Sequence, residues 1–218
     1  MVKIRELTKE EELVNTISHG IGVCLAIPAL VVLIIYANRY GNMWHRLSFT
    51  IFGVSQVFLY IASTLYHGFP KGKAKKVLKI IDHACIYLLI AGSYTPITLI
   101  TLRESIGIHI LGIIWTVAIL GIIYKIFYIN KHIVFSTLLY VAMGFFILVA
   151  IKPIIAGMNS TGFKFLVAGG FFYSVGTIFF ALQQIKYNHA IWHFFVLAGS
   201  ACHFITVLFL LPNFTLFS

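Results

Sequence analysis

Seven apolar segments of about 20 to 23 residues take up most of this sequence, and each is long enough to form a helix across a membrane. They are bounded by charged residues, Gly, Pro or Asn and cover residues 15–37, 47–67, 79–101, 106–127, 132–151, 163–185 and 190–211. An α-helix needs about 20 apolar residues to cross a hydrocarbon core about 30 Å thick. The pattern therefore predicts an all-α integral membrane protein, folded as a seven-transmembrane helix bundle.

The composition excludes the main alternatives. The chain is 60% hydrophobic and only 10% charged, whereas a soluble domain is about 25% charged. A membrane β-barrel would alternate polar and apolar residues, but these segments are continuously apolar. In a nucleic-acid-binding protein, a net charge of +10 would lie as a basic patch on a polar surface. Because this chain has very little polar surface, no nucleic-acid partner is expected. We expect residues 1–218 to form a single domain, because little sequence remains between the segments.

Local signals add detail to this bundle. Residues 1–14 form a short N-terminal segment that we expect to be an interfacial helix, and Thr8 with Glu11 fits a capping box at its start. Pro28 should kink the first span. The stretch from Gly92 to Pro96 should loosen the third span near its end.

The Lys and Arg residues are distributed unevenly between the two sides of the predicted bundle. The side with the N-terminus carries eleven of them, Lys125 included, and the other side carries five. Five of the eleven lie at positions 71, 73, 75, 76 and 79, between the second and third spans. Because cytoplasmic loops are enriched in Lys and Arg, we expect a multi-pass protein of the cell (plasma) membrane with its N-terminus in the cytoplasm and its C-terminus outside. The five-lysine stretch can also be interpreted as a docking site for anionic lipid.

The ionisable residues within the spans gather near one end of the predicted bundle. Asp82, the only aspartate, starts the third span, His67 ends the second, and His189 and His193 open the seventh. Since the chain direction alternates, the start of an odd span and the end of an even span lie at the same face. Ionisable groups inside a membrane are costly and are therefore candidates for function.

The spacing of these residues suits a metal ion. His189 and His193 are four residues apart, on one helix face and about 6 Å apart along its axis. With His67 as a third imidazole, a tetrahedral zinc ion would keep one position open for water, and Asp82 could orient that water or accept its proton. Ser63 lies four residues before His67, on the same face. A proton relay or a polar packing network is an alternative interpretation of the same residues.

Four stretches of the sequence together resemble a known family. The stretches are residues 11–20 (EELVNTISHG), 63–67 (STLYH), 81–83 with 91–96 (IDH and AGSYTP) and 189–193 (HAIWH). In order and content they are similar to the bacterial hemolysin III family, which belongs with the progestin and adipoQ receptors (the adiponectin receptor-like superfamily) and more distantly with alkaline ceramidases. The resemblance extends over nearly the whole chain.

The resemblance implies a zinc site near the cytoplasmic face. The implied ligands are His67, His189 and His193. It further implies that Asp82 holds the metal-bound water, that Ser63 bonds this water or a developing oxyanion, and that Asn15 and His19 support the site.

Two functions from different classes remain open at the level of sequence. One is a zinc-dependent hydrolase acting on a membrane lipid, at an amide bond, with the acyl chain held inside the bundle. The abundant aromatic residues (20 Phe, 11 Tyr and 3 Trp) would suit such a cavity, although lipid-facing and interfacial aromatics are the more common explanation. The other is a membrane-lytic, pore-forming protein or a membrane sensor with structural zinc. Membrane lipids are the expected partners in either case.

Overall fold

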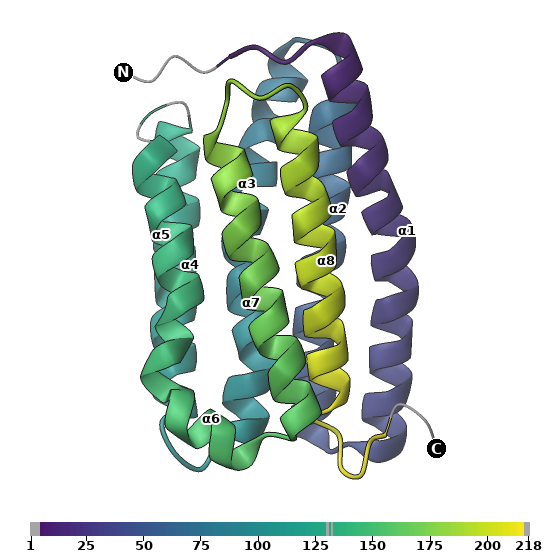
Figure 1. The fold of residues 1–218 in the computed structure, drawn as a ribbon, viewed down its shortest axis with the longest axis vertical. Helices are drawn as coiled ribbons and strands as arrows, with labels where there is room; N and C mark the ends of the chain where they lie inside the picture. The colour runs from purple at the N-terminus through teal and green to yellow at the C-terminus, as the bar shows by residue number, and fades with distance from the viewer. Residues whose placement is uncertain (1–4, 130, 132, 216–218) are drawn as a thin grey trace.

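The chain forms a bundle of long helices that run roughly side by side (Figure 1). The computed structural model describes residues 5–129, 131 and 133–215. Within these residues, seven helical segments are long and apolar enough to cross a membrane, which confirms the predicted seven-transmembrane bundle. The elements are α1 (Lys9–Tyr40), α2 (Met43–Gly68), α3 (Lys73–Pro96), the π-helix η1 (Ile97–Thr101), α4 (Gly107–Tyr128), α5 (Ile133–Phe145), the 3₁₀ helix η2 (Phe146–Ala150), α6 (Ile151–Gly157), α7 (Ser160–Ala181) and α8 (Asn188–Leu208).

The first helix begins where the sequence predicted a cap. The Thr8 hydroxyl accepts a hydrogen bond from the Glu11 amide at 3.2 Å, and the Glu11 carboxylate accepts one from the Thr8 amide at 3.0 Å. Together they satisfy amides that a helix start leaves open. From Lys9 the helix continues into the first span without a break, so residues 9–14 are the first turns of α1 and not a separate helix. Residues 1–4 of the N-terminal segment lie outside the described residues.

Two spans change their helical form part of the way along. The third span changes from α-helix to π-helix directly after Pro96, in line with the loosening expected there. The fifth span passes from α5 through the 3₁₀ helix η2 into α6. It reaches Gly157, six residues beyond the predicted end, because the α6 segment remains largely apolar. The first span passes through Pro28 as one uninterrupted α-helix.

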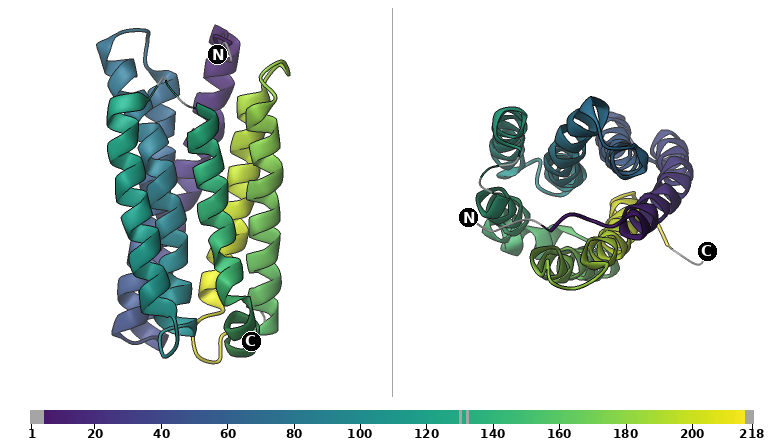
Figure 2. Two further views of the ribbon diagram at one scale, coloured as in Figure 1. Left: turned by 90° about the vertical axis from the view of Figure 1, so that its left-hand side faces the viewer. Right: turned by 90° about the horizontal axis from the view of Figure 1, so that it is seen from above.

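The helices differ greatly in how much of their surface is covered. In an 18-residue stretch of each span, 72% of the residues are buried in α3–η1 and 56% in α2, but only 17% in the fifth span and 11% in α7. Seen along the bundle, α2 lies between α1 and α3, while α5 and α7 follow one another on the opposite side (Figure 2). One side of the bundle is therefore densely packed, and the other encloses a cavity described below.

Candidate metal site

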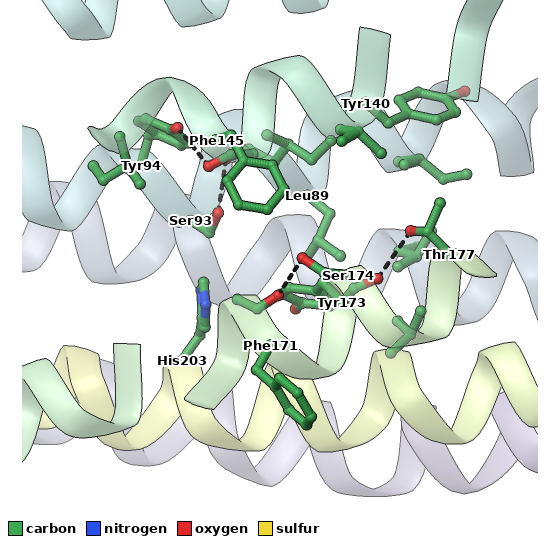
Figure 3. A pocket seen from close by; sticks show the side chains of 18 of the residues that line it. Leu89, Ser93, Tyr94, Tyr140, Phe145, Phe171, Tyr173, Ser174, Thr177 and His203 are labelled. Carbon is green, nitrogen blue, oxygen red and sulfur yellow. Dashed lines mark hydrogen bonds between the residues drawn. The ribbon is translucent and has the colours of Figure 1, made fainter. Parts of the chain in front are cut away.

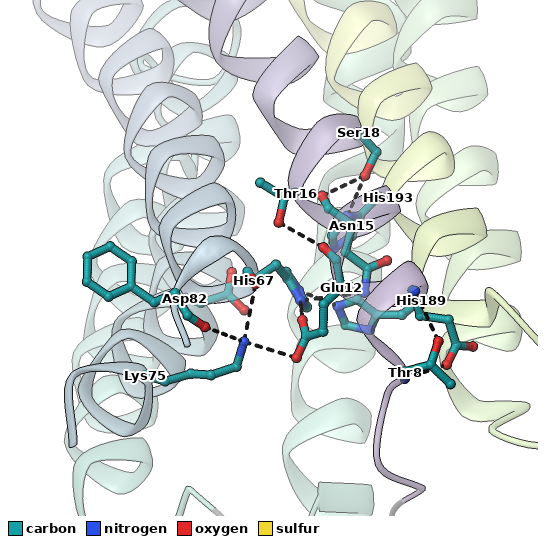
Figure 4. Close-up of polar contacts among 12 residues, drawn as sticks. Thr8, Glu12, Asn15, Thr16, Ser18, His67, Lys75, Asp82, His189 and His193 are labelled. Carbon is teal, nitrogen blue, oxygen red and sulfur yellow. Dashed lines mark hydrogen bonds and ion pairs between the residues drawn. The ribbon is translucent and has the colours of Figure 1, made fainter. Parts of the chain in front are cut away.

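Three histidines converge at the end of the bundle where α1 and α8 begin and α2 ends (Figure 4). His67 lies in the last turn of α2, and His189 and His193 lie in the first two turns of α8. Nε2 of His67 is 3.2 Å from Nε2 of His189. One ring nitrogen from each of the three residues lies within 4.8 Å of the others. The structure therefore brings the three predicted ligands together at a site that can hold a metal ion.

Hydrogen bonds fix which nitrogen of two of these rings faces the site. Nδ1 of His67 lies 2.6 Å from the Glu12 carboxylate, which can only accept, so Nδ1 carries the proton. The Ser18 hydroxyl donates to the Asn15 carbonyl at 2.9 Å and therefore accepts from Nδ1 of His193 at 2.8 Å. In both rings the lone pair is left on Nε2. Carboxylate and hydroxyl partners of this kind orient metal-binding histidines and raise their basicity.

The donor set fits zinc. Two nitrogens bound to one tetrahedral ion at about 2.0–2.1 Å lie about 3.3 Å apart, close to the 3.2 Å between His67 and His189. Three neutral imidazoles are a common zinc ligand set. They also suit copper, iron and nickel, so the ligands alone do not select the metal.

Asp82 and Ser63 lie at the same end of the bundle as the histidines. Both line a cavity that also touches His189 and His193. Asp82 is 6% exposed, and one of its carboxylate oxygens lies 3.4 Å from Nδ1 of the neighbouring His83. Ser63 is completely buried, and its hydroxyl has no hydrogen-bond partner among the described residues. An unpartnered buried hydroxyl beside a metal site is suited to bond a ligand.

The α1 residues named with the family motif pack directly on the ligands. The ring of His19 stacks on that of His193 with 3.5 Å between centroids and 13° between planes. Within the described part of the chain, neither nitrogen of His19 has a hydrogen-bond partner. Nδ2 of Asn15 lies 3.5 Å from Nδ1 of His67. The first span thus contributes a wall of polar side chains to the site.

A buried carboxylate fixes the start of α8 relative to α1. Glu11 is 1% exposed, pairs with Arg5 and accepts a hydrogen bond from the Tyr187 amide at 2.9 Å. Tyr187 precedes α8 in the left-handed conformation, with φ of 60°. The hydrogen bond to Glu11 raises the pKa of Arg5, so the guanidinium remains charged. This contact connects the start of α8, and with it the turn that carries His189, to the first turn of α1.

An elongated cavity of about 510 Å³ leads away from the histidines between α3, α5, α7 and α8 (Figure 3). Its lining on the third span runs from Asp82 in α3 to Ile97 at the start of η1, about 22 Å at 1.5 Å per residue. The lining is mostly apolar, with Ser93, Tyr94 and His203 among the few polar side chains away from the histidine end. Some lining residues are also exposed on the outside of the bundle. They include Phe145, Leu148, Val167 and Phe171. The cavity therefore reaches the lipid-facing surface between the fifth span and α7.

Three residues of this region had no role in the site predicted from sequence. Glu12 and Ser18 are the partners of His67 and His193 described above. A signal was present in the spacing, because Glu12, Asn15 and His19 follow each other at three and four residues on one helix face. Lys125, which we counted among the loop charges, lies inside α4 and is 1% exposed. It lines the cavity.

Comparison with known proteins shows sequence similarity to one family over nearly the whole chain. Residues 7–204 match the family model described as "Haemolysin-III related". The "Hemolysin-3 homolog" of Bacillus subtilis (strain 168) is 51% identical over 202 residues, covering 93% of this chain and 95% of the relative. "Hemolysin-3" of Bacillus cereus is also 51% identical, over 96% of this chain and 95% of the relative. The human "Monocyte to macrophage differentiation factor" is 31% identical over 90% of this chain and 83% of that protein.

Proposed function

We propose that this chain, which belongs to the hemolysin III family, is a zinc-dependent hydrolase that cleaves an amide bond of a membrane lipid. Family membership agrees with the resemblance seen in the sequence motifs, and the chain is an integral membrane protein. Zinc as the metal and hydrolysis as the reaction are our proposal.

One observation carries the proposal: the three converging imidazoles lie at the end of a long apolar cavity that reaches the lipid-facing surface. A lipid entering from the membrane would place its acyl chain along the cavity and its polar head near the histidines. A zinc ion there would supply Lewis acidity toward a carbonyl oxygen and would make water more acidic. A site with three protein ligands and one open position is typical of catalytic zinc, whereas structural zinc usually has four protein ligands.

The residues around the ligands suit the remaining steps. Asp82 is the carboxylate that lines the histidine end of the cavity, and it can accept the proton of the attacking water and pass it to the leaving amine. The Ser63 hydroxyl can donate a hydrogen bond to the oxygen that gains negative charge. The apolar walls exclude bulk water and strengthen both interactions.

We assign the histidine end of the bundle to the cytoplasmic side. The support is the excess of Lys and Arg residues in the segments at this end, which include the five lysines between His67 and Asp82.

Turnover of labelled lipid amides by the purified protein tests the proposal. We expect activity with about one zinc per chain, and loss of both in His193→Ala. His109→Ala removes an exposed histidine of α4 away from the site and should leave both unchanged. Equal turnover by wild type and His193→Ala would overturn the hydrolase proposal, and zinc retained at full occupancy by His193→Ala would overturn the ligand assignment.

The names of the two Bacillus relatives motivate a second candidate, membrane lysis. Dye-loaded phosphatidylcholine vesicles distinguish it from hydrolysis. Leakage caused equally by wild type and His193→Ala would favour lysis without chemistry. Intact vesicles in both cases would exclude it and leave the hydrolase or a membrane sensor with structural zinc.

A further inference from the structure

Lys125 is a cation buried in the wall of the cavity. It is 1% exposed, although it lies only one turn before the end of α4 at Tyr128, where a long side chain could have reached the membrane surface. Instead it lies among the lining residues of the cavity, together with Asp82, His83 and Tyr140. Lys125 therefore borders the space in which we place the lipid.

Within the described part of the chain, the contacts of Lys125 leave its charge without a neutralising partner. Its Nζ lies 5.9 Å from the ring centroid of Tyr140, a long cation–π contact. Among the residues that the structure describes, no carboxylate forms an ion pair with it. Lys79 of α3 lies near enough to add like-charge repulsion. The carbonyl end of α4 favours a cation here, but a helix end supplies only about half a charge.

Burying a charge without a partner is costly, and proteins generally pair such a group with an opposite charge. Tyr140 connects the lysine with the proposed reaction centre, because its hydroxyl donates to the carbonyl of His83, the neighbour of Asp82, at 2.9 Å. An anionic group bound by Lys125 would thus lie at the histidine end of the cavity, where the head of the lipid belongs.

We propose that Lys125 is a binding site for an anionic head group, a carboxylate or a phosphate, on the lipid that occupies the cavity. This inference rests on the proposed function in one respect, namely that an acyl chain fills the cavity. It adds the charge of the ligand: the preferred lipid is an anionic amphiphile and not a neutral one.

Retention of matched lipids tests the site without requiring turnover. The protein is placed in phosphatidylcholine nanodiscs with labelled oleic acid or oleyl alcohol, and in parallel with a monoacylglycerol phosphate or the corresponding monoacylglycerol. Wild type should retain the anionic member of a pair at least about tenfold better, because hydrogen bonds to charged groups are stronger than those between neutral groups. Lys125→Met should lose this preference while still retaining the alcohol, and Lys125→Arg should keep it. The two lipid pairs show whether carboxylate or phosphate is preferred.

The same measurements in His193→Ala separate this site from the metal. If the preference survives in His193→Ala and disappears in Lys125→Met, the lysine holds the anion. If it disappears in His193→Ala and survives in Lys125→Met, the metal holds the anion and the Lys125 site is overturned, while the metal proposal stands. Lys125→Met should remain folded, because an apolar side chain of similar length replaces a buried charge. Its thermal midpoint without lipid serves as the check. An unchanged preference in a folded Lys125→Met protein would likewise refute the site.

Discussion

The two sides of the bundle, α2 and α3 on one side and α5 and α7 on the other, are built in different ways. α2 and α3 bury most of the residues of their spans, and glycines there permit contacts too close for a side chain: a Cβ on Gly92 would lie 2.8 Å from Cβ of Ser55. In the cavity wall, a Cβ on Gly144 or Gly170 would meet nothing within 4 Å. The densely packed side holds the ligand His67 in a fixed position, as a metal site requires, and the open side leaves room for a lipid. The proposed function therefore depends on a difference in packing density between the two sides of the bundle.

The largest expected effect concerns the carboxylate on the densely packed side. Asp82→Asn removes the group that we propose as proton acceptor, and turnover of a labelled lipid amide should fall by about 10²- to 10⁴-fold. The metal content per chain should not change, since Asp82 is not among the three ligands. Unchanged turnover would remove Asp82 from the mechanism, and loss of metal would make it a ligand instead.

A smaller effect is expected from the partner of a ligand. Glu12→Ala removes the acceptor of the His67 Nδ1 proton and should weaken metal affinity by about 10- to 100-fold, measured by competition with a chelator. Glu10→Ala is the matched control, because it removes an exposed acidic residue from the same first turn of α1. If both variants lose affinity equally, the effect belongs to the charge of the turn and not to the bond with His67.

Paired glycine substitutions test the difference in packing itself. Gly92→Ala should destabilise the protein by about 1–3 kcal/mol, because α2 cannot move away without loss of its own contacts. Gly170→Ala should be neutral or stabilising by up to about 1 kcal/mol, since alanine favours a helix and the new methyl group enters open space. Thermal unfolding in one detergent compares the two. A large loss of stability in Gly170→Ala would mean that α7 packs more tightly than the structure shows.

The smallest effects are expected at the rim of the site. Lys75 bonds the Glu12 carboxylate at 3.0 Å and the carbonyl oxygens of His67 and Phe69. Lys75→Met should lower the free energy of unfolding by about 1 kcal/mol. Lys71→Met should leave the thermal midpoint unchanged, because the Lys71–Glu6 pair is 84% and 85% exposed. Equal midpoints for the two variants would show that the Lys75 contacts contribute nothing to stability.

Much of the site could be predicted from the sequence because it depends on local rules. Apolar length gave the spans, alternation of chain direction put His67 beside His189 and His193, and Pro96 marked the change to a π-helix. Glu12 and Ser18 were missed because their roles depend on how α1 is rotated against α2 and α8, which hydropathy does not determine.

The position and extent of the cavity and the buried position of Lys125 could not be predicted from the sequence, for a related reason. A lysine near the end of an apolar segment has the same sequence pattern whether its side chain reaches the membrane surface or turns inward. The choice depends on where α5 and α7 fail to pack against α3 and α4, and that in turn depends on the shapes of many side chains at once.

The contact between Glu11 and Tyr187 also has a consequence for biosynthesis. A chain emerging from the ribosome inserts α1 and α2 early, so His67 is in place long before α8 has been made. His189 and His193 arrive only with α8, the seventh span, and the hydrogen bond from the Tyr187 amide to Glu11 then connects the start of α8 to the first span. A chain synthesised only as far as α7 offers one of the three ligand imidazoles, so the metal site can form only after α8 has been made.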